Sequence, residues 1–173
     1  MLKESLPQAP RIAVIWDPTN PMHAPLLAEA QSAAAKVKVQ VQPVAVGALE
    51  ALEGSLAGLT RERPHALLIV QGPLFFFSRQ RILDFAAKNG LPTIWGWREA
   101  VQDGGLLAYG PIQTDLFYRA AAYVDKILKG VKPADLPFQR PTKFEFVVNL
   151  KTAKTLGLTI PQSVLVRADA LIQ

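Results

Sequence analysis

The stretch ALLIVQGPLFFFS, residues 66–78, decides how the rest of the sequence is interpreted. Its first half is a nearly uniform apolar run, which is typical of a strand in a parallel sheet covered on both faces. Three consecutive phenylalanines then stand where this strand should turn into a helix, a position that normally holds small polar residues. On the first turn of a helix, consecutive side chains point about a hundred degrees apart, so the three rings cannot share one face. We therefore expect one ring at a ligand cleft and the others in the core.

Apolar runs and helical patterns alternate on both sides of this stretch. Alternation at the spacing of βαβ units predicts a doubly wound parallel sheet in a three-layer α/β/α arrangement, with right-handed connections. Pro43 indicates an edge strand or a bulge, Asn20 and Ser78 are expected helix caps, and Pro21 should take a first helical position. The expected strands are residues 11–16, 39–46, 65–71 and 91–97, and the expected helices are residues 22–37, 48–62 and 78–88.

The pattern changes after residue 103. Residues 114–129 have one wide apolar face and predict a strong amphipathic helix, with lysines in its last turn and Gly130 after it. A strand over 106–111 should precede this helix. The proline-rich residues 131–142 predict an extended crossover into a strand over 143–150, after which Asn149 caps a short helix.

Composition limits the classes of protein to consider. The chain has 173 residues, half of them hydrophobic, which suffices for one domain with a real core. It has no cysteine, which excludes disulfides, thiolate metal sites and cysteine nucleophiles. The net charge of +5 comes from scattered basic residues, so no nucleic-acid partner is expected. No run is apolar and long enough to span a bilayer, and the first residues lack the apolar core of a signal peptide.

Motifs for catalysis and for cofactors are missing from the sequence. It contains no G-x-G-x-x-G, no Walker A loop and no G-x-S-x-G, so we expect no enzyme activity and no cofactor. His23 and His65 are far apart and have no metal-like companion, so surface or capping roles are expected for both and no metal site is predicted.

Ligands of doubly wound sheets bind beyond the carboxyl ends of the strands. Polar and aromatic side chains at those ends form our candidate ligand site: Asp17, Asn20, Gln71, Gly72, Phe75, Phe76, Trp97, Arg98 and Tyr109.

Several of these residues also have a purely structural interpretation. Asp17 and Asn20 could hydrogen-bond an amine or a carboxylate of a ligand, or form the turn and cap the helix, and both roles can hold at once. Trp97 and Tyr109 could stack on an aromatic ligand or pack in a core or an interface. Arg98 could clamp a carboxylate or form a surface ion pair with Glu99 or a neighbour.

Long segments of the chain resemble a known family. They are RIAVIWDPTNPMHA, ALLIVQGPLFFFSRQRI, GGLLAYGP and the tail AAAYVDKILKGVKPADLPFQRPTKFEFVVNLKTAKTLGLTIPQSVLVRAD. Together they are similar to the second half of ABC-transporter substrate-binding proteins, in the subgroup that includes tryptophan-binding proteins and uncharacterised lipoproteins. The resemblance covers nearly the whole chain from Arg11. The sequence departs from the family in that the signal peptide and nearly all of the first lobe are absent. There are local departures too: Gly72 stands where an acidic residue is frequent, and Asp17 and Ile112 stand where asparagine is common.

The resemblance implies one lobe of a type I periplasmic-binding-protein fold, plus a crossover strand and helix from a first lobe. Residues 11–103 would be the second-lobe domain, residues 104–135 the strand and helix of the missing first lobe, and residues 136–173 the return to the second lobe. In the family, two lobes close on a small molecule, with an amino acid as the expected ligand. An ABC permease then receives it, in the periplasm or outside the cytoplasmic membrane.

The apolar face of the helix over 114–129 has no sheet to cover in this sequence. We therefore expect two copies to pair through residues 104–135, because an exposed stripe of this kind is an association site. Half a cleft should bind its ligand weakly. The alternatives are a small flavodoxin-like enzyme that binds a nucleotide or flavin, and a structural oligomer that has lost ligand binding.

Overall fold

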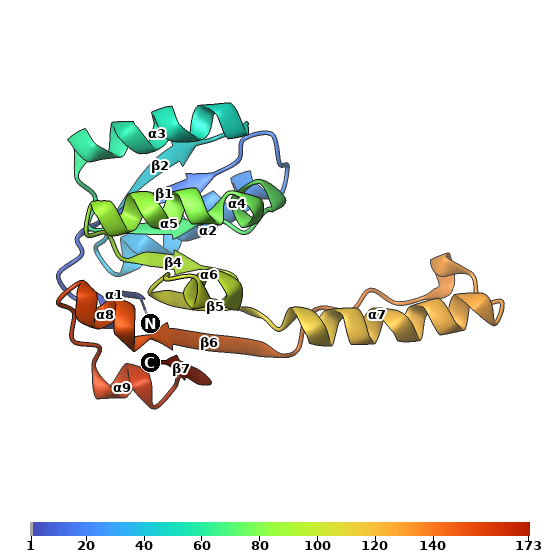
Figure 1. The fold of residues 1–173 in the computed structure, drawn as a ribbon. Helices are drawn as coiled ribbons and strands as arrows, with labels where there is room; N and C mark the ends of the chain where they lie inside the picture. The colour runs from blue at the N-terminus through green and yellow to red at the C-terminus, as the bar shows by residue number, and fades with distance from the viewer. Residues whose placement is uncertain (1) are drawn as a thin grey trace.

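The computed structural model describes residues 2–173 and contains one seven-stranded sheet in the order β2-β1-β3-β4-β5-β6-β7 (Figure 1). Strands β1 to β5 are parallel, β6 runs antiparallel to β5, and β7 is parallel to β6. The predicted doubly wound α/β fold is therefore confirmed. The strands are β1 Arg11–Trp16, β2 Gln40–Ala45, β3 Ala66–Ile69, β4 Thr93–Trp95, β5 Leu107–Pro111, β6 Phe144–Asn149 and β7 Ala170–Ile172.

Helices lie on both faces of the sheet. One face packs against α3 Leu49–Glu62, α4 Pro73–Phe77, α5 Arg79–Lys88 and α6 Arg98–Gln102. The other face packs against α2 His23–Lys36, and its far end against α8 Leu150–Thr155 and α9 Gln162–Leu165. The remaining helices are α1 Leu2–Ser5, α7 Gln113–Leu128 and the 3-10 turn Pro133–Asp135.

The core is built by the alternation of side chains along the strands. In β1, Ala13 and Ile15 point to the face of α3, whereas Ile12 and Val14 point to the opposite face, and all four are buried. A strand that is apolar on both sides in this way is stable only between two helical layers, which is why the sequence forms a three-layer structure.

Helix α7 stands apart from these layers. Pro111 at the end of β5 pairs with Phe144 at the start of β6, and between them the chain runs out along α7 and back through residues 131–143 (Figure 1). We call residues 112–143 the arm. Strand β5 lies inside the sheet between β4 and β6. The predicted segment 104–135 therefore has two parts: the residues up to Pro111 belong to the sheet, and the rest belongs to the arm. That α7 belongs to the first lobe of the family architecture stays a prediction. No helix within residues 2–173 has the length and apolarity needed to cross a membrane.

One predicted helix start and one predicted capping bond were wrong. Helix α2 begins at His23 rather than at Pro21, because the Asn20 side chain accepts a hydrogen bond from the Met22 amide (3.0 Å) and holds residues 20–22 in a turn. Ser78 does not cap α5 through its side chain, since its hydroxyl donates to the Leu74 carbonyl (2.6 Å) of α4. The predicted cap at Asn149 is confirmed, because its Oδ1 accepts from the Thr152 amide at 2.8 Å.

Helix α3 contains two glycines that have no structural role in their own helix. A methyl group at Gly54 or Gly58 would meet no atom within 4 Å. Glycine inside a helix is destabilising by roughly 0.5–1 kcal/mol relative to alanine. We expect Gly58→Ala to raise the free energy of unfolding by that amount in urea titrations, and Gly54→Ala to do the same. Unchanged stability in both variants would contradict the helix as described.

Candidate functional site

The strand order reverses its direction between β1 and β3. After β1 the chain moves outward to β2, and after β3 it moves the other way to β4. At such a switch point the two connections leave in opposite directions and open a crevice at the carboxyl ends of the strands, where ligands of this architecture bind. Asp17 and Asn20 follow β1, and Gln71 and Gly72 follow β3, so the structure brings these four predicted residues together around His23 at the switch point.

A buried histidine joins the two sides of the crevice. The Asp17 amide donates to Nδ1 of His23 (2.9 Å), so Nε2 carries the ring proton and donates to the Gln71 carbonyl (3.0 Å). The ring is almost completely buried and stacks on Phe75, with centroids 6.0 Å apart. The surface or capping role predicted for His23 was therefore wrong. No sequence signal marked it, because both of its partners are backbone groups and one of them, the Gln71 carbonyl, is 48 residues away.

Gly72 is glycine because His23 lies against it. A Cβ at this position would lie 2.7 Å from Nε2 of His23 and 3.8 Å from the side-chain nitrogen Nδ2 of Asn20. A larger residue, such as the acidic one frequent at this place in the family, would therefore require the histidine to move. The glycine at position 72 thus leaves the space that the buried His23 ring occupies.

The turn after β1 holds Asp17 in its ionised form. Partial burial alone would raise the pKa of Asp17. Hydrogen bonds from the Thr19 hydroxyl (2.7 Å) and the Thr19 amide (2.8 Å) outweigh that effect, so the net pKa lies below the ordinary aspartate value. Oδ1 accepts both bonds, and the carboxylate presents a fixed negative charge at the rim of the crevice.

The three phenylalanines point in three different directions. Phe75 is 0% exposed and belongs to the core, so its assignment to the ligand site is corrected. Phe76 is half-buried and packs edge-on against Trp97, with centroids 5.4 Å apart, while the Arg79 guanidinium lies over its other side. Phe77 is 83% exposed. Residue 76 is thus the phenylalanine at the rim, together with the largely buried Trp97.

The ends of β4 and β5 approach each other very closely. A Cβ on Gly110 would lie 2.1 Å from the Gly96 carbonyl oxygen, and one on Gly96 would lie 3.2 Å from the Gln71 side chain. Beside them, Tyr109 is half exposed and stacks on Phe144 (5.8 Å between centroids). The absence of side chains at both glycines lets the Gln71 side chain lie across the end of β4.

Arg98 is engaged in an ion pair. Its Nε donates to the Glu145 carboxylate at 2.8 Å, which ties α6 to β6. Of the two roles considered for Arg98, the structure contains the ion pair, with Glu145 as the partner rather than Glu99. Arg98 could bind the carboxylate of a ligand only if this ion pair opened.

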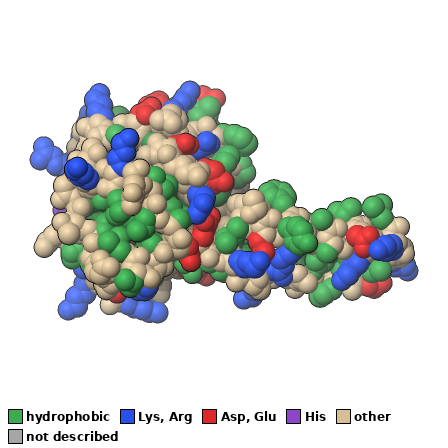
Figure 2. All heavy atoms as spheres, turned by 60° about the horizontal axis from the view of Figure 1, so that its bottom comes forward, with side chains coloured by type: hydrophobic (Ala, Val, Ile, Leu, Met, Phe, Trp, Pro, Cys, Tyr) green, Lys and Arg blue, Asp and Glu red, His purple; other side chains and the backbone are tan. Residues whose placement is uncertain are grey.

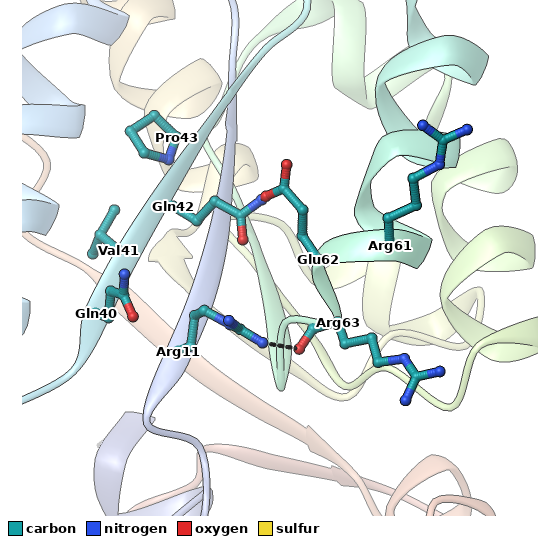
Figure 3. Close-up of a pocket in the computed structure, with 8 residues that line it drawn as sticks. All are labelled: Arg11, Gln40, Val41, Gln42, Pro43, Arg61, Glu62 and Arg63. Carbon is teal, nitrogen blue, oxygen red and sulfur yellow. Dashed lines mark hydrogen bonds between the residues drawn. The ribbon is translucent and has the colours of Figure 1, made fainter.

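The structure also contains a pocket at the opposite edge of the sheet. It has a volume of about 570 Å³ and lies between the starts of β1 and β2 and the end of α3 (Figure 3). Arg11 points across it and donates to the Arg63 carbonyl (2.8 Å), and Gln42 bonds to Glu62, whereas the side chains of Arg61 and Arg63 point away. Nε of Arg11 is buried without a hydrogen-bond partner, and the pocket lies far from the switch point. Residues 2–173 contain no group of three or more acidic, histidine or cysteine side chains that could hold a metal ion.

Comparison with solved structures shows where this fold recurs. A conserved domain protein from Vibrio cholerae superposes with a TM-score of 0.92 at 22% identity, covering 98% of this chain and 57% of its own. An ABC domain from Streptococcus pneumonia, solved in complex with L-Trp, gives 0.92 at 24% identity, covering 99% and 59%. A ligand-free, open substrate-binding protein with adhesive properties from Clostridium difficile gives 0.69 at 19% identity, covering 99% and 57%.

At these identities the superpositions show a shared fold, and the chain spans less than three fifths of each of these proteins. No curated protein matches the sequence. The family described as ABC transporter substrate binding protein matches residues 1–172. With a match over nearly its whole length, and with the resemblance seen in its sequence confirmed, this chain belongs to the ABC transporter substrate-binding protein family.

Proposed function

We propose that this chain binds an amino acid or a similar small molecule at the switch-point crevice, for delivery to an ABC permease and without chemical change. The observation that carries the proposal is the cluster of polar groups at the switch point. There the ionised Asp17, the Asn20 turn and the Gln71 side chain lie at the carboxyl ends of β1 and β3. A carboxylate and amide groups suit the amine and carboxylate of an amino acid.

The aromatic groups at the rim suggest the side chain of the ligand. Phe76 packs edge-on against Trp97, and Tyr109 is half exposed. These aromatic side chains offer apolar faces near the polar groups at the switch point. The Streptococcus pneumonia domain was solved with L-Trp. An aromatic amino acid is therefore the first ligand to test, and a branched apolar one the second.

Affinity should be weak for the chain alone. Binding proteins of this kind enclose their ligand between two lobes, and this chain corresponds to less than three fifths of its solved relatives. From the family we also propose that the protein acts outside the cytoplasm and that its partner is an ABC permease. The flavodoxin-like alternative shares the switch point, but family membership favours a transported solute over a flavin.

Backbone amide spectra recorded during titration with millimolar L-tryptophan and L-leucine test the proposal. We expect shift changes at Asp17, Gln71, Gly96 and Trp97. Gln71→Ala should weaken binding by roughly 2- to 10-fold, the loss of one net hydrogen bond. Gln40→Ala, at an exposed position on the opposite edge, is the matched control and should leave binding unchanged. Shifts confined to the pocket around Arg11, or no shifts with any amino acid, would contradict the proposal.

A further inference from the structure

Strands β1 and β3 stop pairing just before the switch point. Their parallel register ends at Ile15 and Ile69, and continued at that register Asp17 would stand level with Gln71. These two residues are joined instead by the imidazole of His23. One ring nitrogen accepts from the Asp17 amide, and the other donates to the Gln71 carbonyl. We call this arrangement the histidine bridge.

The histidine bridge sets how far apart the two strand ends lie. A direct N–H···O bond between them would span about 2.9 Å. The bridge spans two bonds, of 2.9 Å to the Asp17 amide and 3.0 Å to the Gln71 carbonyl, and the width of the ring besides. The side chains that the proposed function assigns to ligand binding, Asp17 and Gln71, are therefore attached to the two backbone groups that the ring holds in place.

We infer that His23 is a positioning residue for ligand binding and that it acts only in its neutral form. The inference rests on the proposed function, because it concerns the same side chains of Asp17 and Gln71. The His23 side chain is 1% exposed. It therefore acts through the backbone of its two neighbours and not by contacting a ligand.

Only the neutral ring can make both hydrogen bonds of the bridge. Nδ1 accepts only while it carries no proton, and a protonated imidazole has an N–H on both nitrogens. After protonation, Nδ1–H and the Asp17 N–H would be two donors facing each other with their nitrogens 2.9 Å apart. That bond must then break, whereas Nε2 can go on donating to the Gln71 carbonyl. The Asp17 side of the bridge is thus the side that moves.

The segments packed against the ring bring one ionisable side chain to it, that of Asp17. Residues 71–72 and helix α4 have no ionisable side chain, and neither do residues 24–26 in the first turn of α2. Burial raises the pKa of Asp17, but its hydrogen bonds and the charge of a protonated His23 bring it below the ordinary aspartate value. The carboxylate therefore stays ionised and offers the protonated ring an acceptor. Protonation thus draws the Asp17 side chain toward the ring and away from a ligand.

Ligand binding should therefore weaken as the pH falls. Histidine side chains ordinarily take up a proton between about pH 8 and pH 5, so the binding arrangement is favoured at the upper end of this range and lost toward the lower end. The chain has two histidines, and the other, His65, is exposed at the start of β3. Charged side chains of both signs are interspersed on the face shown in Figure 2, so other effects of pH are spread over the surface.

NMR spectra of the ligand-free chain, recorded from pH 8 to pH 5, test the bridge itself. At pH 8 we expect the proton of the His23 ring on Nε2. As the ring takes up its second proton, the Asp17 amide signal should shift with the same midpoint as the ring signals, and the Gln71 amide should shift less. The amide of Gln40, on the opposite edge of the sheet, should not follow. A constant Asp17 signal while His23 titrates, or a ring that takes up no proton in this range, would overturn the inference.

Two variants without a titrating ring separate the two bonds of the bridge. Asparagine at position 23 keeps an acceptor near the place of Nδ1, and glutamine keeps a donor near the place of Nε2. His23→Asn should bind L-tryptophan equally well at pH 8 and pH 5, to within about 2-fold. His23→Gln should bind at both pH values as weakly as the wild type does at pH 5, about 10-fold more weakly than the wild type at pH 8, because one buried hydrogen bond is missing.

His65→Asn is the matched control and should keep the full pH dependence of the wild type. Circular dichroism checks that each variant is folded. The same pH dependence of affinity in His23→Asn as in the wild type would show that another group is responsible and would refute the role of His23. If no amino acid binds at either pH, the proposed function fails, and the ligand-free titration of the wild type still decides on the bridge.

Discussion

Phe75→Ala should destabilise the chain by about 3–5 kcal/mol, the cost of removing a buried aromatic ring and leaving a cavity. Phe75 is fully buried, stacks on His23 and belongs to the core cluster between the sheet and α3 to α6. Urea unfolding followed by circular dichroism measures the effect. The loss would be a large fraction of the 5–15 kcal/mol typical of a whole domain.

The control for this prediction lies two residues away. Phe77 is 83% exposed, so Phe77→Ala should change the free energy of unfolding by no more than about 0.5 kcal/mol. The two variants delete the same ring from the same short helix. Equal losses in both would show that Phe77 is covered in solution and that the placement of the three rings described above is incorrect.

His23→Phe should lower the free energy of unfolding by about 2–6 kcal/mol. Phenylalanine keeps a planar ring against Phe75 but can neither accept from the Asp17 amide nor donate to the Gln71 carbonyl. Each buried backbone group left without its partner costs about 1–3 kcal/mol. Because the two groups lie on opposite sides of the crevice, the amide signals of residues 17 and 71 should broaden or shift in the variant.

The other histidine provides the comparison. His65 is exposed at the start of β3, and His65→Phe should leave stability within about 0.5 kcal/mol of wild type. If His23→Phe unfolds at the same urea concentration as wild type, the crevice is held together by the turn after β1 and not by the histidine.

The sequence predicts the sheet well because each central strand is a short apolar run of a kind that fits only between two helical layers. Residues 66–69 and 11–16 were recognisable for that reason. Helix starts were less predictable. Proline is favoured at a first helical position, but here Pro21 lies in a turn in which the Asn20 side chain accepts from the Met22 amide, a local competition that residue types alone do not settle.

The candidate site was predictable in place but not in detail. The carboxyl ends of β1 and β3 follow from the alternation of elements, and so Asp17, Asn20, Gln71 and Gly72 were found. The role of His23 was not, because both of its partners are backbone atoms and the Gln71 carbonyl is brought near only by tertiary structure. Which phenylalanine lies in the core depends on the exact start of α4, and a shift of one residue turns a side chain by about a hundred degrees.

The pairing of Pro111 with Phe144 makes β5 and β6 a hairpin whose connection is the entire arm. Lengthening such a connection is inexpensive, because each doubling of loop length adds only about 0.6 kcal/mol of closure entropy. The sheet would thus close almost equally well over a short turn. The arm can therefore vary in length with little effect on the stability of the sheet.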